Sequence, residues 1–161
     1  MAAPDDPAAA YQRGLAILAG AAQARAALAR RLGRAGFTPE AIATATEQLA
    51  DHGYLDDAAF AASVARRRQR GGRGAALIAQ ELRRRGVASE LAAATVQDLD
   101  PDAGAGIVGA LAARLAARYP DLPPRERWGR VGAALSRRGH PASVIRTALR
   151  GLTEETPAGE S

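Results

Sequence analysis

Residues 78–99, with the sequence IAQELRRRGVASELAAATVQDL, carry the pattern that decides the fold. Ile78 is followed after four positions by Leu82 and after four more by Gly86, with Arg84 two before this glycine and Leu99 thirteen after it. We call this arrangement the template. It occurs again at Leu28, Leu32, Arg34, Gly36 and Leu49, and at Val131, Leu135, Arg137, Gly139 and Leu152. A template that recurs about every 50 residues predicts stacked helical repeats, which present a long surface to a large partner.

The composition favours thin, closely packed helices and an anionic partner. Hydrophobic residues make up 47% of the 161 positions but aromatic residues only 4%, because alanine, the strongest helix former, supplies much of the apolar content. We expect Tyr54 and Trp128 to be core anchors, since a platform for stacking bases needs several exposed aromatic residues. The net charge is +5, which favours DNA, RNA or an acidic protein surface as partner. The absence of cysteine excludes disulfides and thiolate metal sites.

Glycine and proline divide the chain into nine segments that we expect to be helical, and no alternating pattern indicates a strand. Start signals include Thr38 before Pro39, which places an N-cap ahead of a proline in the first turn, and Asp56 before the next helix. The expected fold class is all-α: a tandem array of three three-helix repeats, elongated, with joints that allow it to curve. We expect a disordered N-terminus over residues 1–7, repeats over 8–53, 54–100 and 101–152, and a disordered tail over 153–161.

The middle of the chain resembles the central signature of RecX regulatory proteins. The resemblance rests on GYLDDAAFA at residues 53–61, on the arginine run and glycine-rich break that follow, and on IAQELRRRGV at residues 78–87. It extends more loosely over residues 12–151 and implies three tandem three-helix repeats. It also implies binding to the RecA recombinase, free and as a filament on DNA, with the protein lodged in the helical groove of the filament. Inhibition of ATP hydrolysis, strand exchange and filament growth is implied in the same way.

Two positions depart from the pattern of that family. Ala22 and Gln23 stand where an Arg-Ser pair commonly starts the second helix of the first repeat, and their presence removes a helix cap. His140 follows the template glycine of the third repeat, where the family usually has an aromatic or apolar residue. Neither departure touches the central signature.

Clusters of arginine are the candidate contacts with the partner. Arg66 and Arg70 share a helix face because they are four positions apart, and Arg73 follows them in the glycine-rich break. The alternative is structural, because each cluster lies in a last helical turn, where cations complement the helix dipole. Arg84 recurs at the same template position in the other repeats, which fits a repeated structural bond or a repeated contact. The candidate residues are Arg66, Arg67, Arg70, Arg73, Arg83 and Arg84.

No group of residues has the pattern of a catalytic, cofactor or metal site. Asp56 and Asp57, adjacent at a helix start, are interpreted as a cap and a charge that complements the dipole rather than as paired catalytic carboxylates. His52 and His140 lack a second metal ligand at a suitable spacing, and we expect His52 to cap the end of its helix. Residues 71–74 cannot form a Walker loop, because the chain has no lysine, and we interpret them as a hinge.

Two functional hypotheses follow from the sequence. The first, which the resemblance implies, is a regulatory protein without enzymatic activity or cofactors that binds RecA and the RecA–DNA filament, with direct contact to DNA left open. Through RecA it implies a role in homologous recombination, DNA repair and the SOS response. The second, from the basic charge alone, is a general helical-repeat protein that binds nucleic acid with a steep salt dependence. Because no signal peptide or membrane-spanning run is present, we expect a cytoplasmic monomer.

Overall fold

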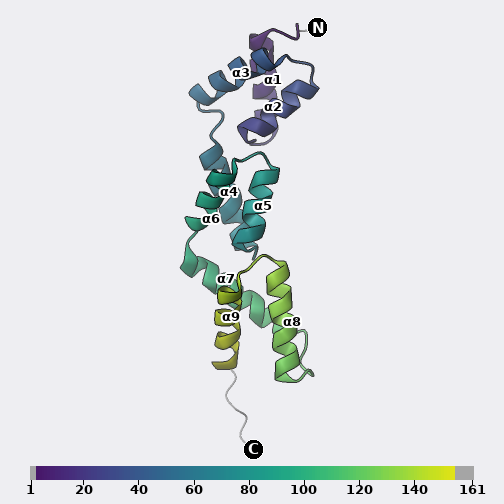
Figure 1. The fold of residues 1–161 in the computed structure, drawn as a ribbon, viewed down its shortest axis with the longest axis vertical. Helices are drawn as coiled ribbons and strands as arrows, with labels where there is room; N and C mark the ends of the chain where they lie inside the picture. Colours follow the sequence, from purple (N-terminus) through teal and green to yellow (C-terminus); the bar gives the residue numbers. More distant parts are fainter. Residues whose placement is uncertain (1–2, 155–161) are drawn as a thin grey trace, which may run out of the picture. The chain divides into compact units, whose positions relative to one another are not determined.

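Helices form the fold throughout the part of the chain that the structure describes. The computed structural model describes residues 3–154, and within them it contains nine helices and no strand (Figure 1). The helices are α1 (Pro7–Gly20), α2 (Arg25–Arg34), α3 (Pro39–Asp51), α4 (Asp57–Arg70), α5 (Ala75–Arg84), α6 (Ser89–Gln97), α7 (Pro101–Ala116), α8 (Pro124–Arg137) and α9 (Ala142–Glu154). The prediction of an all-α fold is confirmed.

The chain divides into two compact units. Unit 1 comprises Met1–Val64 and Glu81–Thr95, and unit 2 comprises Ala65–Gln80 and Val96–Ser161. Within unit 1, α1, α2 and α3 pack against one another, and within unit 2, α7, α8 and α9 do the same (Figure 1). These two groups correspond to the first and third repeats expected from the sequence. The middle group, α4 to α6, contributes residues to both units, so the boundaries of the three repeats stay a proposal.

The template residues build the same helix end three times. The second template position is fully buried in every copy, at Leu32, Leu82 and Leu135. The residue after each template glycine donates its backbone N–H to the carbonyl oxygen of that leucine, at 3.3 Å from Phe37, 3.0 Å from Val87 and 3.3 Å from His140. Such a bond ends a helix when the residue before the donor has a left-handed backbone conformation, that is, a positive φ angle. The φ angles agree, with 97° at Gly36, 94° at Gly86 and 87° at Gly139.

Two adjacent aspartates in unit 1 cap two different helices. Oδ1 of Asp56 accepts a hydrogen bond from the backbone N–H of Ala59 at 2.9 Å and so caps its own helix, as predicted. Oδ1 of Asp57 instead accepts from the backbone N–H of Arg25, at the start of α2, at 2.8 Å. The N-cap residue of α2, Ala24, makes no side-chain hydrogen bond there. Asp57 therefore supplies the cap that the sequence around α2 lacks.

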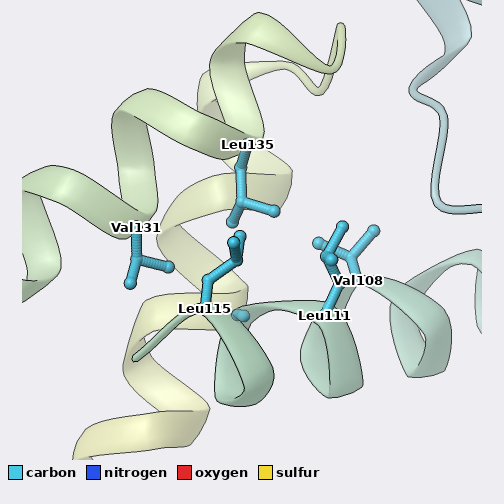
Figure 2. Packing of buried hydrophobic residues seen from close by; sticks show 6 residues of the cluster. Val108, Leu111, Leu115, Val131 and Leu135 are labelled. Atoms are coloured by element: carbon cyan, nitrogen blue, oxygen red, sulfur yellow. The ribbon is translucent and has the colours of Figure 1, made fainter. Parts of the chain in front are cut away.

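Each unit has its own apolar core. In unit 1, buried leucines of α2, of α3 and of the turn after α3 form one cluster: Leu28, Leu32, Leu49 and Leu55. In unit 2, Figure 2 shows buried side chains of α7 and α8 that point toward one another: Val108, Leu111, Leu115, Val131 and Leu135. No residue of α9 is buried, whereas its template counterpart α3 buries four. The apolar residues of α9 therefore cover the core of unit 2 while staying partly at the surface.

Three local features differ from the sequence predictions or fall outside the structure. Residues 3–6, expected to be disordered, form a turn in which Asp6 caps α1 and the carbonyl oxygen of Pro4 accepts a 2.8 Å hydrogen bond from Thr38. Tyr54, expected in the core, is 55% exposed, because the next residue, Leu55, occupies the apolar cluster instead. Residues 153 and 154 of the expected tail belong to α9, and residues 155–161 lie outside the described residues.

Candidate partner-binding surface

The arginine run at the end of α4 presents exposed side chains in unit 2. Arg66, Arg67 and Arg70 are exposed, whereas Arg68 is half-buried. Successive residues of a helix are rotated by about 100°, so such a run cannot form one flat face. Arg66 and Arg70 are one turn apart and project from the same side. The three candidate residues of this helix are therefore accessible. Arg68, which was not a candidate, is partly covered by the rest of the chain.

A second arginine run ends α5 and belongs to unit 1. Arg83 and Arg84 are exposed. Arg85 is half-buried and pairs with Glu81, with 2.7 Å between the guanidinium nitrogen and the carboxylate oxygen, and Glu81 itself is buried. Arg85, which was not a candidate, therefore has a structural role as the partner of a buried carboxylate. Arg83 and Arg84 therefore lie in a different unit from the candidates of the α4 run.

The glycine-rich segment after α4 is a bonded loop. The backbone N–H of Gly74 donates to the carbonyl oxygen of Arg138 at 2.8 Å. Nε2 of His140 lies 2.9 Å from the carbonyl oxygen of Gly72 and donates to it in the tautomer protonated at Nε2. Both bonds join the loop to the end of α8, which differs from the hinge expected from the sequence. The second bond gives the imidazole of His140 a structural role in holding this loop.

Beside this loop, unit 2 contains an apolar groove with a volume of about 790 Å³, which we call the unit 2 groove. Its walls come mainly from α7 and α9. The rest comes from the ends of α4 and α6, the loop, the start of α5, and the segments that join α6 to α7 and α8 to α9. Residues that represent these walls are Gln69, Ile78, Leu99, Val108, Val144 and Ala148. Arg73 is the candidate residue that lines this groove, and its side chain is exposed. The volume falls within the range of typical ligand-binding pockets.

Sequence reasoning missed the unit 2 groove. The helical spacing of Val144, Ala148 and Leu152 predicts a buried face of α9, and these residues do pack against the core of unit 2, but they are only half-buried and also line the groove. A signal was present in α7, where Ala105 and Gly109 line the groove and a Cβ on Gly109 would meet no atom within 4 Å. Residues this small leave space between facing helices, and periodicity alone cannot tell whether a neighbouring side chain fills that space.

The site combines two kinds of contact surface. Apolar walls can receive side chains of a partner protein, and exposed guanidinium groups can bind carboxylates or phosphates through charge-assisted hydrogen bonds. Among residues 3–154, no three His, Asp or Glu side chains gather as a metal site would require. Over the same residues, the helices lack the length and hydropathy that crossing a membrane demands.

The chain resembles known proteins over most of its length. A family model described as the second three-helix domain of RecX matches residues 56–96, which include α4, α5 and most of α6. The chain is 34% identical over 145 residues to Regulatory protein RecX of Halorhodospira halophila, a match that covers 90% of this chain and 89% of that protein. It is also 34% identical over 140 residues to Regulatory protein RecX of Xanthomonas citri, with 86% and 85% covered.

Solved structures have the same fold. The crystal structure of RecX from Lactobacillus salivarius superimposes with a TM-score of 0.88 at 20% identity, and covers 92% of this chain and 97% of that chain. A second crystal structure of regulatory protein RecX gives a TM-score of 0.78 at 26% identity, with 88% of this chain and 72% of that chain covered. The sequence match over nine-tenths of its length, together with this shared fold, shows that the chain belongs to the RecX family of regulatory proteins.

Proposed function

We propose that this protein binds the RecA recombinase and its filament on DNA, and inhibits RecA ATP hydrolysis, strand exchange and filament growth. Membership of a family of regulatory proteins supports the proposal, because a regulator acts on a partner. RecA is the partner that the resemblance of the central signature implies. The proposed setting is the cytoplasm, in homologous recombination, DNA repair and the SOS response.

The observation that carries the proposal is the unit 2 groove with Arg73 in its lining. Burying apolar side chains of a partner protein against apolar walls makes the free energy of binding more favourable. Cations contribute to the affinity for a phosphate backbone, whereas aliphatic walls do not. Binding to naked nucleic acid would therefore leave this groove unused. The groove therefore favours a protein partner over the general nucleic-acid-binding alternative.

The exposed arginines supply the electrostatic part of the proposed contact. Arg66 and Arg70 project from one side of α4, and Arg73 follows in the loop that lines the groove. Their guanidinium groups can pair with carboxylates of RecA or with phosphates of the DNA inside the filament. Inhibition follows if the protein binds one arrangement of the RecA subunits more tightly than the arrangement that hydrolyses ATP, because differential affinity shifts a conformational equilibrium.

ATP hydrolysis and strand exchange by RecA on single-stranded DNA test the proposal. The protein is added from substoichiometric to equimolar amounts at moderate salt, and we expect both rates to fall. Unchanged rates at equimolar protein would refute the proposal. Duplex DNA added as a competitor separates the two hypotheses, since a general nucleic-acid-binding protein would be drawn away from the reaction and the inhibition would disappear.

A further inference from the structure

A second, smaller pocket lies on unit 2 between α8 and α9. It has a volume of about 400 Å³ and is lined by Trp128, Leu149, Thr153 and two arginines, Arg146 and Arg150. None of these residues lines the unit 2 groove. The two arginines are one helical turn apart on α9, and both side chains are exposed. The pocket therefore combines an apolar floor with a rim that carries two cations.

The chain fixes the indole of Trp128 in this pocket through its neighbour Arg127. Nε of Arg127 donates to the carbonyl oxygen of Tyr119 at 2.9 Å, and the terminal nitrogen Nη2 donates to those of Pro120 and Leu122 at 2.7 and 2.9 Å. The same guanidinium lies 5.8 Å from the centroid of the Trp128 ring, within range of a cation–π interaction. Because Arg127 is bonded to three backbone carbonyls, it serves to position Trp128, and Arg146 and Arg150 are the arginines that line the pocket.

The surroundings of the pocket are strongly basic. Over residues 124–154, which the structure describes throughout, the acidic residues are Glu126 and Glu154. Against them stand the arginines of α8, of its C-cap and of α9: Arg125, Arg127, Arg130, Arg137, Arg138, Arg146 and Arg150. The corresponding helices of unit 1, α2 and α3, carry Glu40, Glu47 and Asp51 in addition to their arginines. An acidic occupant is therefore the electrostatic complement of this surface of unit 2.

We propose that this pocket binds an acidic polypeptide segment of a partner protein. One aliphatic or aromatic side chain of the segment sits against Trp128 and Leu149, and carboxylates on either side of it pair with Arg146 and Arg150. A nucleobase fits less well, because the pocket offers a single aromatic ring that already interacts with Arg127, whereas stacking sites for single strands use several aromatic rings. This proposal does not depend on which protein is regulated, so it can fail or hold independently of the proposed RecA function.

Intrinsic fluorescence tests the proposal directly, because Trp128 is the only tryptophan in the chain. The full chain is titrated with a short capped peptide of glutamates around two central leucines, and tryptophan emission is recorded. We expect a saturable change in the emission of Trp128. A matched peptide with serines in place of the leucines is expected to bind much more weakly. No change in emission with the leucine peptide, or equal binding of the serine peptide, would overturn the proposal.

Two pairs of substitutions assign the binding to the pocket. Arg146→Gln with Arg150→Gln should weaken peptide binding roughly tenfold, the loss expected for two exposed charge pairs. Arg114→Gln with Arg118→Gln removes the same charge from exposed positions that line neither pocket, and should weaken binding by about twofold at most through long-range attraction alone. Equal effects of the two pairs would overturn the proposal. So would tighter binding of oligothymidylate with the same dependence on Arg146 and Arg150, which would assign the pocket to nucleic acid. Circular dichroism checks that each variant keeps its helices.

Discussion

The backbone N–H of Gly74 donates a 2.8 Å hydrogen bond to the carbonyl oxygen of Arg138 and so joins the glycine-rich loop after α4 to the end of α8. The two backbones are in close contact there, since a Cβ atom on Gly74 would collide with the backbone of Gly139. Arg73, the preceding residue, lines the unit 2 groove. The loop therefore contributes to the proposed binding surface by holding Arg73 in place.

Replacing Gly74 with alanine should destabilise the protein. The added methyl group has no space against Gly139 and His140, and overpacking of this kind costs about 1–3 kcal/mol in the free energy of unfolding. Gly106, inside α7, is the matched control because a Cβ there meets no atom within 4 Å. Gly106→Ala should raise the free energy of unfolding by roughly 0.5–1 kcal/mol through helix propensity. Urea titration of both variants measures the two changes, and destabilisation of equal size in both would contradict the close contact.

Asp57→Ala should lower the free energy of unfolding by about 1 kcal/mol, the usual cost of losing a helix cap. The carboxylate of Asp57 caps α2 through the N–H of Arg25, where Ala24 provides no side-chain bond. Asp51→Ala is the control, because Asp51 is exposed at the C-terminal end of α3, where a carboxylate opposes the helix dipole. The free energy of unfolding of this control, measured by thermal unfolding, should stay within about 0.5 kcal/mol of the value for the parent protein. An unchanged Asp57→Ala variant would show that the bond to α2 contributes nothing.

The two outer repeats should respond differently to the same truncation. Leu49 and Leu152 occupy the same template position, but Leu49 is fully buried and Leu152 only half-buried. Leu49→Ala should cost about 2–5 kcal/mol of stability, because it leaves a cavity in the core of unit 1. Leu152→Ala should cost roughly 1 kcal/mol, because part of its surface already faces water. Chemical denaturation of the two variants compares them, and a larger loss for Leu152→Ala would contradict the burial assigned to α9.

The sequence predicts the scaffold because the signals for it are local. The spacing from Leu82 to Gly86 specifies a buried anchor and a helix end within a single turn, and Asp56 caps the helix that directly follows it. The features that the sequence does not reveal depend on residues far apart in the chain. Asp57 caps a helix that begins 32 positions earlier, and hydrophobicity alone gives no reason why Leu55 is buried and Tyr54 exposed.

The same distinction applies to the candidate site. Runs of arginine identify accessible cations such as Arg66 and Arg70, because the end of a helix is exposed in most packings. The unit 2 groove and the smaller pocket between α8 and α9 depend on how α9 packs against its neighbours, which periodicity does not encode. Val144, for example, packs against the core of unit 2 and also lines the groove.

Reversing the charge of Arg66, Arg70 and Arg73 to glutamate should weaken binding to the RecA filament without unfolding the protein. These side chains are exposed, and each reversal should cost about 1 kcal/mol of binding free energy, roughly 100-fold in affinity for the three together. The control replaces Arg13, Arg30 and Arg31 with glutamate. These arginines are exposed in unit 1, so the control has the same net charge as the first variant. Filament-binding isotherms and circular dichroism measure both triple variants. If helicity and inhibition both survive the change in unit 2, the partner contacts a different surface.

The central claim is that the protein recognises RecA rather than nucleic acid in general. Its most direct test is the affinity of the labelled full chain for a RecA filament on single-stranded DNA, compared at moderate salt with its affinity for the same DNA without RecA. The account predicts tight, saturable binding to the filament and weak binding to the naked DNA. Equal or tighter binding to naked DNA, with the steep salt dependence of phosphate contacts, would contradict it.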